Sequence, residues 1–355
     1  MIKVLIVDDS AIVRAMIKQI METDIRFQIV GIAENGEKAV LRNTELNPDL
    51  IVMDINMPVM DGLAATKKIM ETSDPAVVCF STEDSVDIGY QCIEAGALEL
   101  IRKPDFSVMT TEVLQDFCER LVEIADKHAK NRRDKAQNQT KQKEKASAAK
   151  EEIPASENTN HRYELCLIGA STGGPAAVQT VLTGLGSNFP LPILVTQHID
   201  SLFDVQFAKW LDGSTGMEVE LAENGTIVKP GHAYVSPANV HLEVEEVPGK
   251  AGEYQLLLSD EPPLHFLKPA VDKLFFSASK VCKEKTLAII LTGMGRDGAD
   301  GCKQIVDGGG MTIAQDENSC IVFGMPRAAI ECGGVKAVKA LDDIAPYVKN
   351  LVGAR

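Results

Sequence analysis

The chain has 355 residues, of which 45% are hydrophobic and 25% are charged; these are globular values, and the length suffices for two domains of ordinary size. The net charge of -15 argues against a nucleic-acid partner. The eight cysteines are scattered without a C-x-x-C pair, which favours a reducing compartment over a disulfide scaffold. The first apolar run is too short for a signal peptide, and no run approaches the ~18 apolar residues of a membrane span. We therefore expect a cytoplasmic protein that does not insert into membranes.

Residues 1–126 alternate short apolar runs with amphipathic stretches. This repetition of strand and helix predicts a parallel sheet with helices on both faces, in the flavodoxin-like (βα)5 arrangement. We expect strands at 3–7, 28–33, 50–53, 77–80 and 98–101, and helices at 11–22, 36–46, 63–72, 86–94 and 111–127.

Residues 127–161 have little apolar surface to bury and predict a polar, flexible linker that is helical near its start. The charges in this segment favour a solvated tether over a binding motif. From residue 162 to 355 the alternation resumes, and we expect a second doubly wound, mainly parallel α/β domain with a small antiparallel insertion. Its predicted strands are 165–169, 193–197, 286–291 and 311–314, its predicted helices include 175–185 and 270–280, and short strands with turns are expected at 225–236 and 241–259.

Acidic side chains follow two of the predicted strands in the first domain. Asp8, Asp9 and Asp54 fall where carboxyl ends of parallel strands meet. Carboxylates gathered there repel each other and favour a hard cation such as Mg²⁺. Ser81 and Lys103 follow two further strands and offer a hydroxyl group and a cation for an anion. Any one aspartate alone would be interpreted as a helix cap, but the five groups together predict a phosphate-and-metal site.

These positions resemble a response-regulator receiver domain. The resemblance implies that Asp54 accepts a phosphoryl group from a histidine kinase. Leu100 stands where the family often has an aromatic switch residue. The motifs that carry the resemblance are Val7-Asp8-Asp9-Ser10, Met53-Asp54-Ile55-Asn56-Met57-Pro58, Asp61-Gly62, Ser81 and Lys103-Pro104.

The same resemblance implies a complete ligand set for the receiver domain. It implies Mg²⁺ held by Asp9, Asp54 and the Asn56 carbonyl, with Asp8 acting through water. It also implies that Ser81 and Lys103 contact the phosphoryl group.

A glycine-rich turn, residues 169–175, joins a predicted strand to a predicted helix in the second domain. Its small residues expose Ser171 near the helix N-terminus, where free backbone N–H groups favour developing negative charge. Gly169 to Gly173 also satisfy the G-x-S-x-G nucleophile elbow. A phosphate cradle is the alternative interpretation of the same turn.

A serine nucleophile needs a base and an acid that orients the base. His198 ends the run 193–197, at the same predicted sheet edge as Ser171. Asp297 follows the run 287–291 at that edge, although spacing alone does not exclude three other aspartates. The order Ser, His, Asp disfavours a standard α/β-hydrolase. The competing aspartates are Asp200, Asp272 and Asp316, and the other histidines are His128, His161, His232, His241 and His265.

The second domain resembles the catalytic domain of the chemotaxis protein-glutamate methylesterases. The resemblance implies Ser171 as nucleophile, His198 as base and Asp297 as its acid, with the Met294 backbone near the oxyanion. Its motifs are Gly169-Ala170-Ser171-Thr172-Gly173-Gly174, Gln197-His198, Pro269-Ala270-Val271-Asp272, Thr292-Gly293-Met294-Gly295-Arg296-Asp297-Gly298, Ala314-Gln315-Asp316-Glu317 and Phe323-Gly324-Met325-Pro326. The chain departs from the common pattern at Lys209-Trp210, Lys268 and Ala270.

The combination implies a phosphorylation-activated esterase that demethylates glutamate γ-methyl esters, and deamidates glutamines, on methyl-accepting chemotaxis receptors. The phosphodonor would be the chemotaxis histidine kinase, and we expect a monomer. No metal-spaced His/Cys cluster is present in the second domain, so we expect no cofactor there. The alternatives are an output domain that only binds a partner and a hydrolase of unrelated small esters.

Overall fold

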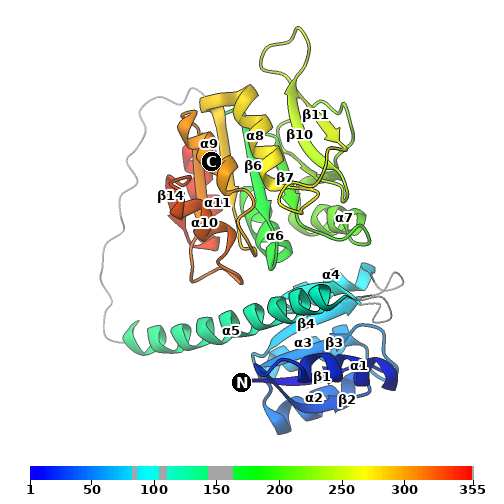
Figure 1. The fold of residues 1–355 in the computed structure, drawn as a ribbon. Helices are drawn as coiled ribbons and strands as arrows, with labels where there is room; N and C mark the ends of the chain where they lie inside the picture. Colours follow the sequence, from blue (N-terminus) through cyan, green and yellow to red (C-terminus); the bar gives the residue numbers. More distant parts are fainter. Residues whose placement is uncertain (82–85, 104–109, 143–162, 354–355) are drawn as a thin grey trace. The chain divides into compact units, whose positions relative to one another are not determined.

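The computed structural model describes residues 1–81, 86–103, 110–142 and 163–353 (Figure 1). The chain divides into two compact units, residues 1–149 and 150–355. Pro104, His161 and the predicted linker beyond residue 142 lie outside the described residues. The predicted domain limits at 126 and 162 therefore stay predictions.

The first unit contains a five-stranded sheet in the order β2-β1-β3-β4-β5, with every pairing parallel. This order is that of the flavodoxin-like fold and confirms the predicted class. Strands β1, β3 and β4 are almost wholly buried, as continuous apolar runs in a doubly covered sheet require. The strands are β1 (Ile2–Val7), β2 (Phe27–Ala33), β3 (Leu50–Asp54), β4 (Ala76–Ser81) and β5 (Glu99–Arg102).

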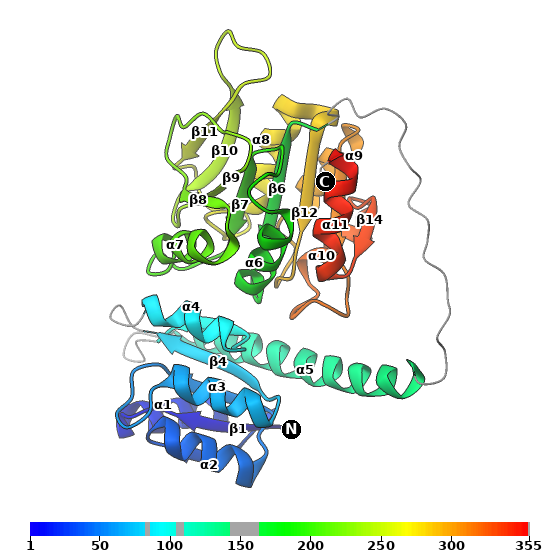
Figure 2. The ribbon, with the colours of Figure 1, turned by 180° about the vertical axis from the view of Figure 1, so that it is seen from behind.

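Helices cover both faces of this sheet, with α2, α3 and α4 side by side on one face and α1 and α5 on the other (Figures 1 and 2). The side chains of Ser10, Asn35 and Asp61 accept a backbone N–H from the first turns of α1, α2 and α3, the interaction that starts a helix. The helices are α1 (Ala11–Glu22), α2 (Gly36–Leu46), α3 (Gly62–Thr72), α4 (Val86–Glu94) and α5 (Thr111–Gln142).

Helix α5 ends at Gln142, well beyond the end predicted near residue 127. Residues 127–142 are polar, but they contain neither glycine nor proline and are rich in lysine, arginine, alanine and glutamine. These residues have high helix propensity. His128 and Arg132 also bond to the Asp74 carbonyl, at 3.0 and 2.8 Å, so this part of α5 is tied to its own unit.

The second unit contains a seven-stranded sheet in the order β14-β13-β12-β6-β7-β9-β8, again with parallel pairings. Helices α8 and α9 lie on one face, and α6 and α11 pack together on the other (Figures 1 and 2). The strands are β6 (Leu165–Ala170), β7 (Ile193–Gln197), β8 (Glu218–Leu221), β9 (His232–Val235), β12 (Thr286–Ile290), β13 (Met311–Gln315) and β14 (Ala337–Lys339). The helices are α6 (Gly174–Leu185), α7 (Asp204–Thr215), α8 (Val271–Cys282), α9 (Ala299–Asp307), α10 (Met325–Glu331) and α11 (Leu341–Val352), with a 3-10 turn η2 (Lys283–Lys285).

The predicted antiparallel insertion is a hairpin of β10 (His241–Glu246) and β11 (Tyr254–Ser259). Its apolar side chains join a buried cluster with α8, and the Val244 N–H donates to the Ser277 hydroxyl at 3.0 Å. Strand β9 lies in the segment 225–236, which was also expected to join the insertion. Instead β9 pairs in parallel with β7 and belongs to the main sheet.

Candidate functional site

The ends of three adjacent strands bring Ser171 and His198 together. Strand β6 pairs with β7 on one side and with β12 on the other. The His198 N–H donates to the Ala170 carbonyl at 3.0 Å, and the Ser171 N–H donates to the Thr292 carbonyl at 3.0 Å. Ser171 therefore lies between the carboxyl ends of β7 and β12, the edge at which open α/β sheets bind ligands.

The turn that carries Ser171 needs its glycines. Gly173 has a φ of 72°, in the left-handed region, and a Cβ there would lie 2.6 Å from Ile321. A Cβ on Gly174, the first residue of α6, would lie 2.0 Å from the side-chain oxygen of Gln197. A side chain at Gly173 or Gly174 would therefore disturb the turn that places Ser171 just before α6. At the start of α6, the Gly174 N–H already donates to the Ser171 carbonyl at 2.7 Å, and Pro175 has no N–H.

Gln197 is a residue whose role the sequence did not reveal. Its side-chain amide is buried and donates to the Ser171 carbonyl at 2.8 Å and to the His198 carbonyl at 2.9 Å. One amide thus fixes the backbone of both residues. In the sequence, Gln197 stands beside His198 in one of the motifs that carry the family resemblance, but the resemblance gave it no role of its own.

His198 is hydrogen-bonded to Asp297, with 2.7 Å between Nε2 and Oδ2. Asp297 is buried, and it also accepts the backbone N–H groups of Val271 at 2.6 Å and Asp272 at 3.0 Å, at the start of α8. Burial alone would raise the pKa of Asp297, but His198 and these two N–H groups outweigh it and hold the pKa below its usual value. The carboxylate is therefore ionised and able to stabilise a positive imidazole.

The three competing aspartates are engaged elsewhere. Asp316 accepts the N–H of Ser319 at 2.9 Å, and Asp200 is exposed and accepts the N–H of Leu202 at 2.9 Å. One oxygen of Asp272 accepts the Gly301 N–H at 2.7 Å. Within the part of the chain that the structure describes, Asp297 is the carboxylate that bonds to His198.

The other described histidines have local partners. His241 is buried and bonds to the Pro262 carbonyl and the Ala270 N–H, each at 3.2 Å. His232 lies 3.2 Å from a Glu218 oxygen, and His128 bonds to the backbone of Asp74. The His265 Nε2 atom lies 4.0 Å from Asp272 Oδ2.

The loop after β12 passes directly over Ser171. A Cβ on Gly293 would lie 2.7 Å from the Ser171 Cβ, and Met294 is the next residue. The Thr292 N–H donates to the Gln315 side chain at 2.8 Å, and its hydroxyl donates to the Thr172 carbonyl at 2.9 Å. This places the predicted oxyanion segment beside the serine and gives Gln315 a supporting role that the sequence did not show.

The acidic cluster of the first unit also forms. The carboxylates of Asp8, Asp9 and Asp54 offer oxygens within 4.8 Å of one another, and Asp8 and Asp54 are buried. The Lys103 Nζ atom lies 2.7 Å from Asp8 Oδ2 and 3.1 Å from Asp54 Oδ2. Burial and the charge of Asp8 raise the pKa of Asp54 to about 6 despite Lys103. Three carboxylates face one lysine, so their negative charge is not fully balanced, and oxygen ligands of this kind suit Mg²⁺.

For Asn56 and Ser81, the other two predicted receiver residues, backbone hydrogen bonds fix the position of the chain. Asn56 is exposed and follows Ile55, which is held by hydrogen bonds to Phe80 and Gly62. The backbone of Ser81 pairs with Arg102, next to Lys103. The side chain of Ser81 lies outside the described part, so its predicted contact with a phosphoryl group stays a prediction.

Comparisons with known proteins find relatives of both units of the chain. Residues 4–114 match the family described as response regulator receiver domain, and residues 166–348 match CheB methylesterase. The chain is 36% identical to the protein-glutamate methylesterase/protein-glutamine glutaminase of Aliivibrio fischeri over 100% of both chains. It is 37% identical to the protein of the same name from Archaeoglobus fulgidus, over 98% of this chain and 97% of that one. The CheB methylesterase catalytic domain of Thermotoga maritima matches with a TM-score of 0.51 and 36% identity, covering 54% of this chain and 98% of that one.

In the described residues we find no helix with the length and apolar character that crossing a membrane requires.

Proposed function

Because the chain belongs to the CheB methylesterase family and carries a receiver domain, we propose that it hydrolyses glutamate γ-methyl esters on methyl-accepting chemotaxis receptors. The same site deamidates receptor glutamines, and phosphorylation of Asp54 by the chemotaxis histidine kinase activates it. The enzyme acts in the cytoplasm as a monomer. The observation that carries the proposal is the placing of Ser171 beside His198, with His198 bound to the buried Asp297 at 2.7 Å.

The hydrogen bond to Asp297 fixes the histidine ring. Because Nε2 bonds to Asp297, Nδ1 is the nitrogen that takes the Ser171 proton. The serine oxygen then attacks the γ-carbonyl carbon of the ester. His198 returns the proton to the departing methoxide, methanol leaves, and a water molecule activated by His198 releases the glutamate. With a glutamine substrate the leaving group is ammonia.

The negative charge of the tetrahedral intermediate needs donors that are already in place. The backbone N–H of Met294, one residue after the close contact between Gly293 and Ser171, supplies one donor, and the dipole of α6 adds positive potential at its N-terminus.

In the receiver unit, Asp9, Asp54 and the Asn56 carbonyl would hold Mg²⁺, with Asp8 acting through water. The ion supplies positive charge for the incoming phosphoryl oxygens. Asp54 is the acceptor, and Lys103 and Ser81 contact the phosphoryl group. Phosphorylation shifts the population toward states in which receptor reaches Ser171.

The test is methanol release from methylated chemoreceptor membranes, with and without acetyl phosphate and Mg²⁺. We expect release that rises with the phosphodonor and is absent from the Ser171→Ala variant. Release that ignores the phosphodonor would refute the switch. A folded protein that releases no methanol under either condition would support a partner-binding output domain, and activity on a generic ester alone would support a small-ester hydrolase.

A further inference from the structure

A buried carboxylate next to the candidate active site has one oxygen without a hydrogen-bond donor. Asp272 is the second residue of α8 and is fully buried. Its Oδ1 atom accepts the Gly301 N–H at 2.7 Å, whereas Oδ2 has no hydrogen-bond partner among the described residues. A buried polar oxygen without a donor costs free energy, and a buried charge requires a counter-charge. Burial and the charge of Asp297 accordingly raise the pKa of Asp272.

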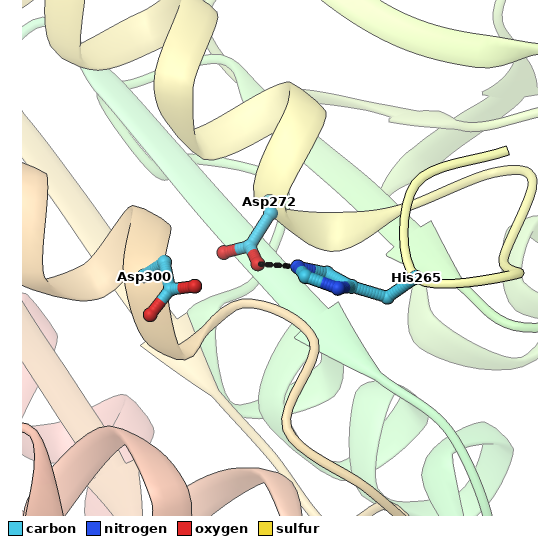
Figure 3. Close-up of side chains that lie close together, drawn as sticks. All are labelled: His265, Asp272 and Asp300. Atoms are coloured by element: carbon cyan, nitrogen blue, oxygen red, sulfur yellow. Dashed lines mark ion pairs between the residues drawn. The ribbon is translucent and has the colours of Figure 1, made fainter. Parts of the chain in front are cut away.

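Two further side chains from other elements lie near the Asp272 carboxylate. His265 lies on the loop before α8, and its Nε2 atom is 4.0 Å from Asp272 Oδ2. Asp300 lies in the first turn of α9. The three residues offer ligand atoms within 4.8 Å of one another, and Figure 3 shows Asp272 between the other two side chains.

We propose that His265, Asp272 and Asp300 bind one divalent transition-metal ion, and that Zn²⁺ is the ion they fit best. One imidazole and two carboxylates form the mixed nitrogen and oxygen set that Zn²⁺ accepts, whereas Mg²⁺ and Ca²⁺ prefer oxygen ligands. A water molecule completes a four-coordinate site.

Modest side-chain shifts bring the three ligand atoms to the spacing that this ion requires. Ligand atoms bound at ~2.1 Å in a tetrahedral site lie ~3.4 Å apart. The distance of 4.0 Å from His265 Nε2 to Asp272 Oδ2 must shorten by roughly half an ångström. All three ligand atoms lie within 4.8 Å of one another, so no pair must close by more than ~1.4 Å. His265 and Asp300 are partly exposed and free to move by that amount, while Asp272 is fixed by burial.

Asp300 already has a partner in Arg296, whose two guanidinium nitrogens lie 2.9 and 2.8 Å from its carboxylate oxygens. Both side chains are about half exposed, and such a pair on the surface of a helix contributes little. Each carboxylate oxygen has two lone pairs, so Asp300 can bind a metal and keep one bond to Arg296.

The proposed ion would be linked to Asp297 through the backbone of Asp272. The Asp272 N–H donates to Asp297 Oδ1 at 3.0 Å, so an ion on the Asp272 side chain is attached to the same helix end that orients His198. Binding joins the loop, α8 and α9. We therefore expect Zn²⁺ to raise the thermal unfolding temperature of the protein, because it binds only the folded arrangement of the three ligands.

Equilibrium dialysis of the full-length chain against Zn²⁺, in excess Mg²⁺ to occupy the receiver carboxylates, tests the proposal. We expect the wild type to bind one more Zn²⁺ per chain than His265→Asn. The Asp300→Asn variant should bind that ion at least tenfold more weakly. His232→Asn is the matched control, because His232 is a partly exposed histidine of the same unit that pairs with Glu218, and it should bind like the wild type.

Co²⁺ provides a second readout, because a bound imidazole and carboxylates give visible absorption bands that should disappear in His265→Asn. Circular dichroism of each variant establishes that it is folded, and Asp272→Asn is left out because the residue is buried. Equal Zn²⁺ stoichiometry in wild type and His265→Asn, or an equal loss in His232→Asn, would overturn the proposal.

Discussion

The carboxylate of Asp297 accepts three hydrogen bonds at once, from His198 and from the two backbone N–H groups that begin α8. An asparagine at this position has the same shape, but it cannot balance the charge of a protonated imidazole. We therefore expect Asp297→Asn to lower kcat for methanol release by on the order of 10³–10⁴-fold, as loss of a triad acid does elsewhere.

The control for this prediction is Asp200→Asn, since Asp200 is an exposed aspartate two residues from His198. It should retain nearly full activity. Loss of activity in Asp200→Asn together with retention in Asp297→Asn would assign the acid to Asp200. Circular dichroism distinguishes a chemical loss from misfolding.

Asp54 provides a pH prediction. Its folded pKa of about 6 lies above the ordinary value of 3.8. The protonated form is thus favoured by folding, and stability from this group is present below pH ~4 and lost as pH rises through ~6. A shift of ~2 units corresponds to up to ~3 kcal/mol.

In metal-free buffer, Asp54→Asn should therefore become increasingly more stable than the wild type between pH 4 and 6, with a constant difference above pH ~7. Urea unfolding at several pH values measures this difference. A constant difference across the whole range would contradict it. Mg²⁺ should stabilise the wild type more than the variant.

The sequence predicts Ser171, His198 and Asp297 as a triad, but spacing did not choose among four aspartates. The choice depends on the fold, because the N-terminus of α8 delivers two N–H groups to Asp297 and to no other candidate. Gln197 and Gln315 lie in motifs that carry the family resemblance, but their roles were not predicted, for a related reason. Each acts by bonding a side-chain amide to the backbone of a residue distant in sequence, and no local pattern predicts such a contact.

At the scale of elements, the turn between β6 and α6 is the most constrained part of the site. A methyl group on Gly174 would lie 2.0 Å from the Gln197 side chain, which holds the backbones of Ser171 and His198. We expect Gly174→Ala to destabilise the protein by about 1–3 kcal/mol. It should lower kcat by on the order of 10²-fold with a smaller effect on KM, because the nucleophile and base are displaced.

Gly213→Ala is the matched control, since this glycine lies in α7 with no atom within 4 Å of a new Cβ. Alanine should leave activity unchanged and add up to ~1 kcal/mol of stability. Thermal unfolding measures the stability of both variants, and steady-state kinetics measure their kcat and KM. Equal kinetics in Gly174→Ala and wild type would show that the Gln197 amide is not needed for positioning.

The long buried strands could be predicted because continuous apolar runs between helices leave few alternatives. Strands β8, β9 and β14 have only four, four and three residues. Runs this short carry little periodicity, and β9 reaches the main sheet only by pairing with β7, far away in the sequence. Helix α5 extends further than predicted because residues 127–142 are polar but have high helix propensity.

At the scale of the whole molecule, the receiver and catalytic units each have their own sheet and core. Ser171, His198 and Asp297 all belong to the second unit, and no side chain of the first unit is needed for the chemistry proposed for them. The proposed triad is therefore complete without the receiver. Basal activity and its stimulation by a phosphodonor should be separable by substitution.

Asp54→Asn should separate them. The amide cannot be phosphorylated, so methanol release should persist at the basal rate and show no response to acetyl phosphate and Mg²⁺. Asp49→Asn is the matched control, because Asp49 precedes β3 at the end opposite to Asp54 and accepts the Lys3 N–H at 2.9 Å. It should respond like the wild type. A response that survives in Asp54→Asn would place the phosphoryl acceptor elsewhere, and loss of basal activity in that variant would show that the catalytic unit depends on the receiver for more than regulation.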